Sequence, residues 1–203
     1  SQKALAQLQE ITSNSKETEA QYEQASRLYQ LLSGGNPKKI PLQQFILGIM
    51  LDDILTYANE FFSLLSRGRY SLRRLEGSAG GNAKSGLDLE VLDGFTGAPR
   101  SIETLSGGEQ FLASLSLAFG LSDVVQSYSG SVRLDSIFID EGFGSLDQDT
   151  LDTAMKALSQ IQKMGRTVGI ISHVSELKNR IATQIQVHPS KNGGSSITMI
   201  KDA

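Results

Sequence analysis

The chain has 203 residues, of which 39% are hydrophobic, and it carries a formal net charge of -3 with no cysteine and no tryptophan. This length suffices for one domain with a buried core and an appendage. The lack of cysteine excludes disulfides and thiolate metal sites, and because the sequence shows no long apolar run or leader peptide we expect a soluble, cytoplasmic protein.

Residues 1 to 32 contain no glycine or proline, and apolar side chains recur there at alternating steps of four and three. The positions on this seam are Ala4, Leu8, Ile11, Ser15, Thr18, Tyr22, Ala25, Tyr29 and Leu32. This spacing predicts one strand of a coiled coil over residues 1–33, and the alternative is an ordinary amphipathic surface helix. The run Ser33-Gly34-Gly35-Asn36-Pro37 then ends the helix, and a second domain follows over residues 34–203.

Residues 42–66 carry apolar side chains at helical spacing, which predicts a second, better buried helix. After Gly68 the spacing changes to two. The apolar positions are then Tyr70, Leu72, Leu87, Leu89 and Val91, with the turn sequence Gly80-Gly81-Asn82 between them. This pattern predicts a hairpin at the edge of a sheet.

Helices and strands alternate beyond Pro99. We expect helices at 109–127, 150–164 and 175–181, and strands at 134–139, 167–172, 185–187 and 196–200. Continuous apolar strands that alternate with helices predict an α/β fold with a parallel sheet covered on both faces. In such sheets ligands bind beyond the carboxyl ends of the strands.

Charged residues are distributed unevenly. In one segment the basic residues outnumber the single acid Glu76, and they are Arg67, Arg69, Arg73, Arg74 and Lys84. In a later segment the acids meet no basic residue, and they are Asp135, Asp140, Glu141, Asp147, Asp149 and Asp152. Such a concentration of carboxylates is typical of a cation site.

The sequence TLSGGEQ places Ser106, Gly107 and Gly108 directly before an apolar helix. A capping serine followed by glycines presents a hydroxyl and free backbone N–H groups at the positive end of the helix dipole. This arrangement predicts an anion site suited to a terminal phosphate. The alternative is a plain turn that only caps the helix.

The strand Ile137-Phe138-Ile139 ends in the adjacent carboxylates Asp140 and Glu141. Neighbouring side chains of a strand point in different directions, so one carboxylate can hold Mg²⁺ while the other orients and deprotonates a water. An acidic loop after a core strand is the alternative. The glycine-rich turn that follows ends in Ser145, Leu146 and Asp147.

His173 also follows a predicted strand, at the end of the sequence IISH. A histidine in this place can donate a hydrogen bond to a phosphate oxygen or to a water, and the alternative is a structural histidine. The order of the three motifs places all of them on one edge of one sheet. His188, next to Pro189 in a later strand, is interpreted as structural.

The succession of LSGGE, a hydrophobic strand ending in DE, then SLD and SH resembles the carboxyl-terminal half of an ABC-type ATPase head. More narrowly, the chain is similar to the SMC-like family, in which a long coiled coil is inserted between two half-heads. The coiled-coil strand, Gly68-Arg69-Tyr70 after an apolar helix, and FIDEGFGSLD resemble the ATPase subunits of bacterial DNA-repair nucleases. The similarity covers essentially the whole chain.

The resemblance implies roles for the signature residues. Ser106, Gly107 and Gly108 would bind the γ-phosphate of an ATP held by the opposing head, and Glu109 and Asp147 would be further nucleotide-binding residues. The loop Ser145, Leu146 and Asp147 would communicate across the dimer.

The resemblance also implies roles for the residues at the strand ends. Asp140 would be the Walker B magnesium residue, Glu141 the catalytic base, and His173 the switch histidine that contacts the γ-phosphate. The implied cofactors are ATP and Mg²⁺.

A P-loop is missing from the sequence, because the nearest candidate, residues 80–85, lacks the glycine before Lys84 and does not lead from a strand into a helix. In the resembled family the P-loop lies in the amino-terminal half. Since the chain also starts at Ser1 within a predicted coiled coil, we expect a fragment of a longer chain.

The implied partners are a complementary half-head carrying the P-loop, a second head in an ATP-sandwich homodimer, a metal-dependent nuclease subunit and double-stranded DNA, at the nucleoid in the cytoplasm. The basic segment would contact the DNA backbone, or it is the solvated face of a hairpin. The alternative functions are an SMC-type chromosome-organising head, another recombination-repair ATPase, or a non-catalytic scaffold that binds DNA under nucleotide control. A transporter ATPase fits less well, since it would carry its P-loop upstream on the same chain and no coiled coil.

Overall fold

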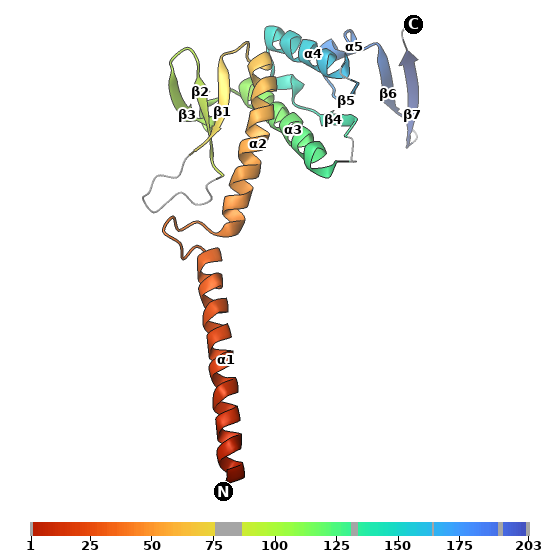
Figure 1. The fold of residues 1–203 in the computed structure, drawn as a ribbon. Coiled ribbons are helices and arrows are strands. Elements are labelled where there is room, and N and C mark those ends of the chain that lie inside the picture. The colour runs from red at the N-terminus through yellow and green to blue at the C-terminus, as the bar shows by residue number, and fades with distance from the viewer. Residues whose placement is uncertain (1, 76–86, 131–133, 164, 191–192, 202–203) are drawn as a thin grey trace.

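The computed structural model describes residues 2–75, 87–130, 134–163, 165–190 and 193–201. In chain order its elements are α1 (Gln2–Leu32), α2 (Leu42–Leu65), β1 (Tyr70–Arg74), β2 (Leu89–Asp93), β3 (Ala98–Ser101), the 3-10 helix η1 (Ile102–Thr104), α3 (Gly107–Ser129), β4 (Ser136–Asp140), the 3-10 helix η2 (Phe143–Ser145), α4 (Gln148–Lys163), β5 (Thr167–Ile171), α5 (Ser175–Lys178), β6 (Thr183–Pro189) and β7 (Ser195–Lys201). Figure 1 shows α1 as an arm that leads away from the body of the molecule. No helix within these ranges is long and apolar enough to cross a membrane.

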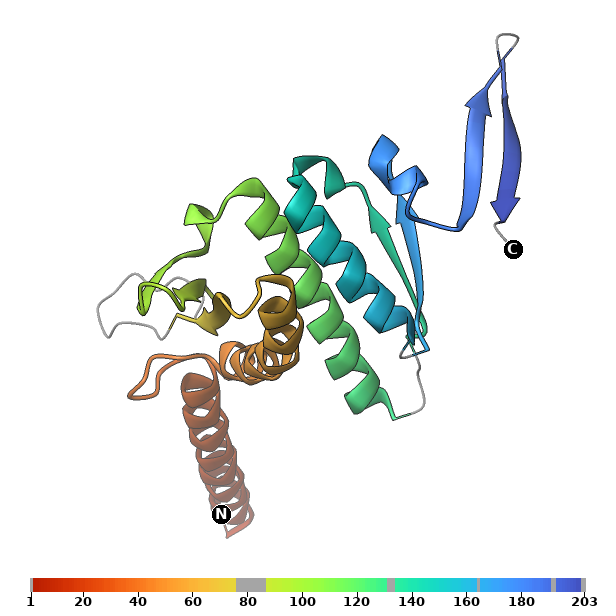
Figure 2. The same ribbon diagram turned by 90° about the horizontal axis from the view of Figure 1, so that it is seen from above.

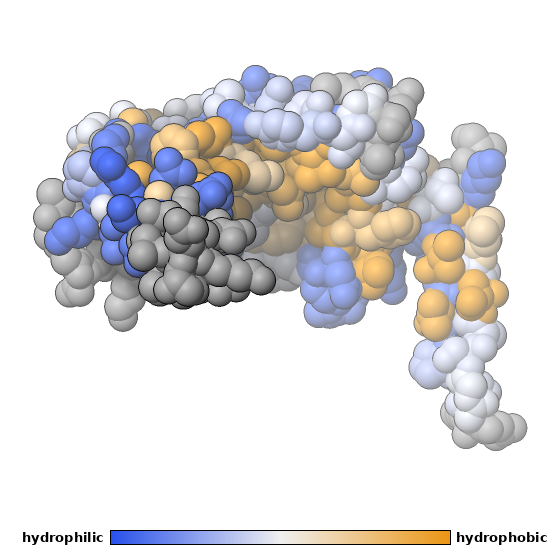
Figure 3. All heavy atoms as spheres, turned by 60° about the horizontal axis from the view of Figure 1, so that its bottom comes forward, coloured by the Kyte–Doolittle hydropathy of each residue, from blue (hydrophilic) through white to orange (hydrophobic). Residues whose placement is uncertain are grey.

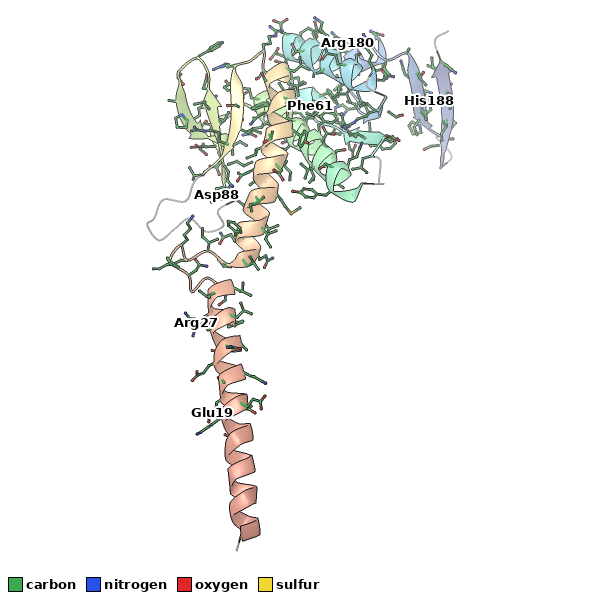
Figure 4. All side chains as sticks on the ribbon, viewed as in Figure 1. Glu19, Arg27, Phe61, Asp88, Arg180 and His188 are labelled. Carbon is green, nitrogen blue, oxygen red and sulfur yellow. The ribbon has the colours of Figure 1, made fainter. Side chains whose placement is uncertain are left out.

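The helix predicted at the amino terminus is confirmed as α1. From Ser15 onward its side chains are exposed except that of Ser26, which is half-buried, and Tyr22 and Tyr29 of the predicted seam are 74% and 73% exposed. Glu19 and Arg27 project from the same arm (Figure 4). A polar helix with an exposed apolar seam requires a partner to bury it. Pairing of α1 in a coiled coil therefore stays a prediction.

The second predicted helix is confirmed as α2, but only its carboxyl-terminal half is well buried. Leu55, Ala58, Phe62 and Leu65 face the core, whereas the apolar side chains of the first two turns are exposed. The exposed side chains are Leu42, Phe45, Ile46, Leu47, Ile49 and Met50. Helical periodicity indicates an apolar face without showing what covers it, and the part of the chain that the structure describes leaves the amino-terminal half of that face uncovered.

The predicted hairpin forms a separate three-stranded antiparallel sheet in the order β1-β2-β3, with Leu72 opposite Val91. The third strand, β3, includes Pro99 and was not predicted, and the expected turn at residues 80–82 lies outside the described residues. Asn59 of α2 binds the free edge of β1, donating to the Leu72 carbonyl at 2.9 Å and accepting from its N–H at 2.7 Å. The sheet is thereby attached to α2.

Strands β4 and β5 are parallel, as predicted, with Ile139 opposite Ile170. Figure 2 shows α3 and α4 on the same side of this pair. Ile139 is buried in the core with side chains of both helices, among them Phe119 and Leu158. The prediction of a sheet covered on both faces is wrong for this chain, because Phe138 and Ile171, on the other face, are 73% and 56% exposed.

The last two predicted strands are confirmed as β6 and β7, but they form an antiparallel pair of their own. One face of this hairpin is apolar and exposed (Figure 3), and it consists of Ile185, Val187, Ile197 and Met199. Figure 4 labels His188 on the same hairpin, where it lies opposite Ser196. His188 therefore belongs to this hairpin and not to the ends of β4 and β5.

Candidate functional site

Ser106 caps the amino terminus of α3 in a capping box. Its hydroxyl accepts a hydrogen bond from the Glu109 N–H at 3.3 Å, and Oε2 of Glu109 accepts from the Ser106 N–H at 2.8 Å. The next helical hydrogen bond runs from the Gln110 N–H to the Ser106 carbonyl. No described residue accepts from the N–H groups of Gly107 and Gly108, which are therefore available at the positive end of the helix dipole.

The two glycines before α3 differ in what surrounds them. A Cβ on Gly108 would lie 3.3 Å from Cδ2 of Leu146 and 3.6 Å from the Ser145 carbonyl, so packing against the following loop favours glycine there. A Cβ on Gly107 would meet only the Ser145 Cβ, at 3.9 Å, which is an ordinary contact. Packing within the chain thus explains why residue 108 is a glycine. At Gly107 the space is open, so a ligand from outside the chain can approach the backbone there.

The adjacent carboxylates lie at the end of β4 as predicted. Asp140 is exposed, and no described residue donates a hydrogen bond to its carboxylate or forms an ion pair with it. Glu141 continues the pairing with β5, since its N–H donates to the Ile171 carbonyl at 2.8 Å, yet its φ of 60° lies in the left-handed region. That backbone conformation is costly for a residue other than glycine, and such outliers cluster at functional sites.

Glu141 and His173 contact each other across the ends of β4 and β5. Nδ1 of His173 lies 2.9 Å from Oε2 and 3.1 Å from Oε1 of Glu141. Both side chains are open to solvent, with 83% of His173 and 50% of Glu141 exposed. The structure therefore brings together two residues that the sequence separates by 32 positions.

Aromatic packing connects the acidic turn to α3. Phe143 of η2 is buried and makes an edge-to-face contact with Phe111 of α3, with ring centroids 4.9 Å apart. A Cβ on Gly142 would lie only 2.2 Å from Cε2 of Phe111, so the ring occupies the space that any side chain at Gly142 would need. The turn after Glu141 and the first turns of α3 are consequently fixed to each other.

Asp147 precedes α4 and accepts hydrogen bonds from both the N–H and the hydroxyl of Thr150, at 2.9 and 2.8 Å. These bonds, that from the backbone N–H above all, lower the pKa of Asp147. Ser145, earlier in the same loop, donates to the Gly142 carbonyl at 3.0 Å. Asp147 therefore has a local role as a helix cap, and communication across a dimer stays a prediction.

The basic segment forms ion pairs and hydrogen bonds within the chain. Arg73 lies 2.8 Å from Glu90 and Arg74 lies 2.7 Å from Asp52. Arg69 forms ion pairs with Asp93 and Glu109, and Arg67 donates a hydrogen bond to Thr153. Lys84 lies outside the described residues. Since these cations already have partners, the structure adds no support for a DNA contact, which stays a prediction.

Tyr70 is a site residue whose role the sequence did not reveal. Its hydroxyl donates to Oε1 of Glu109 at 2.7 Å and accepts from Nη2 of Arg100 at 3.0 Å. Burial and the bond to Glu109 raise the pKa of Tyr70 to about 12. Burial opposes ionisation of Glu109, but the hydrogen bonds from Tyr70 and Ser106 outweigh it and lower the pKa of Glu109.

The sequence is similar to a known protein family and to subunits of bacterial nucleases. Residues 86–160 match the family described as SbcC/RAD50-like, Walker B motif. The chain is 48% identical over 192 residues to the SbcC subunit of nuclease SbcCD from Vibrio cholerae serotype O1, an alignment that covers 95% of this chain and 19% of that protein. It is 49% identical over 161 residues to the SbcC subunit of nuclease SbcCD from Staphylococcus aureus strain JH9, covering 79% and 16%. The chain thus spans less than a fifth of the length of these relatives.

Solved structures show the fold. The Smc head domain with an extended coiled coil from Pyrococcus furiosus, solved with the C-terminal domain of ScpA, superimposes with a TM-score of 0.61 at 19% identity, covering 95% of this chain and 44% of that chain. The SMC head domain from Thermotoga maritima gives a TM-score of 0.52 at 19% identity, covering 79% and 52%. The fold is that of an SMC ATPase head, an ABC-type P-loop NTPase fold, and in sequence the chain is similar to the SbcC subunits of nuclease SbcCD.

Proposed function

We propose that this chain is the carboxyl-terminal half of an ATPase head whose ATP-driven dimerisation controls the access of a nuclease to DNA double-strand breaks. The contact between Glu141 and His173, next to the exposed Asp140 carboxylate at the ends of two parallel strands, is the observation that carries the proposal. This edge is where ligands bind in α/β sheets.

Asp140 fits a magnesium ion held jointly with a nucleotide. No group of three or more metal-ligating side chains occurs among the described residues, so a site formed by the protein alone is not indicated. Mg²⁺ keeps several waters and binds through one or two carboxylates together with phosphate oxygens, a pattern that one exposed carboxylate satisfies. When bound, the ion would neutralise charge on the phosphates of ATP.

Glu141 is the proposed base and His173 its partner. With its proton on Nδ1, His173 donates to Glu141 and orients the carboxylate, which then accepts a proton from the attacking water. A second proton, on Nε2, lets the same ring donate to a phosphate oxygen. Both side chains are exposed, as required of groups that must meet a nucleotide arriving from another segment.

The turn of Ser106, Gly107 and Gly108 is proposed to bind the γ-phosphate of an ATP held by the opposing head. Its two N–H groups, from which no described residue accepts a hydrogen bond, and the open space at Gly107 support this role. The Ser106 hydroxyl accepts from Glu109, so its own proton remains available to a phosphate oxygen. Glu109 contributes by holding this turn.

A complementary segment would supply the P-loop, since G-x-x-x-x-G-K-[ST] does not occur in the sequence. The exposed face of β4 and β5, with Phe138 and Ile171, supports a covering segment from outside this chain. Two such completed heads would enclose two ATP molecules. The relatives, which are named as the SbcC component of nuclease SbcCD, support an SbcD-like nuclease as the partner, acting on double-stranded DNA.

Among SMC-like heads, sequence identity favours the nuclease subunit. The chain shares 48% identity with the SbcC protein from Vibrio cholerae but 19% with the SMC heads of similar fold. A chromosome-organising head is therefore the weaker alternative.

The substitution Glu141→Gln in the full-length subunit tests the proposal. Because the amide keeps the shape of the side chain but cannot accept the proton, Mg²⁺-dependent ATP hydrolysis should fall by a factor of about 10²–10⁴, while ATP still induces dimers. Glu176→Gln, at an exposed glutamate of α5, is the control and should hydrolyse ATP at the wild-type rate. Equal rates for Glu141→Gln and the wild type would refute the role of Glu141.

A further inference from the structure

The carboxylate of Glu109 connects the amino end of α3 to the three-stranded sheet. Oε2 accepts the Ser106 N–H at 2.8 Å, and Oε1 accepts the Tyr70 hydroxyl at 2.7 Å. Nη1 of Arg69 lies 3.7 Å from Oε1. The Glu109 side chain thus binds Ser106, the residue before the two glycines. It is itself bound by Tyr70, the first residue of β1, and by Arg69.

Tyr70 is fixed in turn by its surroundings. Its ring is 4% exposed and stacks on Phe62 of α2, with centroids 5.9 Å apart and an interplanar angle of 21°. The guanidinium groups of Arg69 and Arg100 lie 4.6 and 5.3 Å from the ring centroid. Because Arg100 donates to the Tyr70 oxygen, the hydroxyl proton is directed to Glu109.

Arg100 also holds the other side of the turn. Its Nη1 donates to the carbonyl and to the hydroxyl of Thr104, both at 3.2 Å. Asp93, which is 3% exposed, forms an ion pair with Arg69 at 3.1 Å and lies 3.8 Å from Arg100. The segment from Thr104 to Glu109 is therefore bound at both ends to one network of charged and aromatic side chains on the sheet.

We propose that Tyr70 is a positioning residue for the turn Ser106-Gly107-Gly108: through Glu109 it sets the orientation in which the serine hydroxyl and the glycine N–H groups meet the phosphate of an opposing head. The inference rests on the proposed function of that turn. Preorganised donors stabilise the charge of a transferring phosphoryl group, and a loosened turn loses this effect although ATP still binds its own head. The deficit therefore falls on kcat and leaves KM nearly unchanged.

The test compares Tyr70→Phe with Tyr128→Phe in the full-length subunit. Tyr128 on α3 is a matched control, because its hydroxyl likewise donates to a carboxylate, Asp53, at 2.7 Å, while its side chain is exposed and remote from the turn in sequence. Three quantities are measured for each variant: ATP hydrolysis, the thermal unfolding midpoint, and amide hydrogen exchange at Ser106, whose N–H depends on Glu109.

Tyr70→Phe should lower kcat about tenfold, with KM within about twofold of the wild type, and should speed exchange at the Ser106 amide. Tyr128→Phe should change neither. If Tyr70→Phe and Tyr128→Phe hydrolyse ATP equally, or if kcat falls only in step with thermal stability, the positioning role is wrong.

The exchange measurement separates this inference from the proposed function. A wild-type subunit that hydrolyses no ATP would refute the proposed function, whereas exchange at Ser106 would still show whether Tyr70 holds the turn. Unchanged exchange in Tyr70→Phe refutes the inference whatever the hydrolysis rate. Combining Tyr70→Phe with Glu109→Ala should cost no more turnover than Glu109→Ala alone, because removal of the carboxylate already breaks the connection between Tyr70 and Ser106.

Discussion

Two successive residues after β4 have positive φ angles, 60° at Glu141 and 95° at Gly142. Phe111 occupies the space beside Gly142, so packing of α3 holds the proposed base in a conformation that Glu141 would not adopt by itself. The strain at Glu141 costs about 1–3 kcal/mol, and the contact of the buried Phe143 with Phe111 stabilises this turn by about 0.5–1.5 kcal/mol beyond the area that it buries.

Gly142→Ala should destabilise the protein by about 1–3 kcal/mol and displace Glu141, because the new Cβ would collide with the Phe111 ring 2.2 Å away. The expected result is a lower unfolding midpoint together with slower ATP hydrolysis. Gly144→Ala is the control: a Cβ there would contact only Val174, at 3.8 Å, and should be tolerated. Wild-type stability of Gly142→Ala would show that Phe111 does not fix this turn.

The raised pKa of Tyr70 predicts that the protein loses stability at alkaline pH. Its pKa is 10.0 when unperturbed and about 12 in the folded chain, so the folded state keeps the proton more tightly than the unfolded state does. Its contribution to stability is complete below pH 10 and is lost as the pH rises from 10 to about 12. Urea unfolding across this range should show a steeper loss for the wild type than for Tyr70→Phe, and parallel curves would contradict the assignment.

Between elements, α2 and α3 cross closely at Gly120. Gly120 permits it, because a Cβ on this residue would lie 2.6 Å from the Ile54 carbonyl and 2.7 Å from the Ala58 nitrogen. These are backbone atoms, so neither helix can yield without moving as a whole. The crossing carries Phe61 against Phe119, with ring centroids 5.1 Å apart.

Gly120→Ala should therefore lower the free energy of unfolding by about 1–3 kcal/mol. Gly48→Ala, in the same pair of helices, is the matched control. The atoms nearest to its Cβ would belong to the Arg74 guanidinium, at 3.3 Å, which is a side-chain group and not backbone, and alanine is the better helix former. Chemical denaturation of both variants measures the difference, and equal stability of the two would show that the crossing is looser than described.

The sequence predicted most elements because their signals are local. The apolar run ending in Asp140 and the cap at Ser106 each specify a structure within a few residues. The strand β3 was missed because Pro99 disfavours a strand, although it is tolerated at the sheet edge that β3 occupies. The Tyr70 to Glu109 bond could not be predicted, since it joins residues 39 positions apart through tertiary packing.

At the scale of the whole molecule, apolar surface is exposed on two separate sheets. The face of β4 and β5 with Phe138 and the face of the β6–β7 hairpin with Ile197 are open in this chain. Burying such side chains stabilises an association by about 1.5–3 kcal/mol each. The sequence periodicity predicted that these faces are apolar, but it also led us to expect that helices of the same chain would cover them.

Ile197→Asn should weaken the association of this chain with the proposed complementary half-head about tenfold, because one exposed apolar side chain of the hairpin is lost. The next residue provides the control, since Thr198 lies on the opposite face of β7 and Thr198→Asn should have little effect. Co-expression of both segments and measurement of the fraction that co-purifies tests the prediction. Equal recovery of both variants would place the interface elsewhere.

Asn36 occupies the interval between α1 and α2, and its side chain spans it: Nδ2 donates to the carbonyls of Leu31 and Ile40, and Oδ1 accepts from the Ile40 N–H. The helical hydrogen bonds are interrupted between Leu32 and Leu42, so α1 and α2 are two separate helices joined by a short loop. A change in the direction of α1 would therefore reach the rest of the molecule through this loop, where the Asn36 side chain connects the last turn of α1 to the residues before α2.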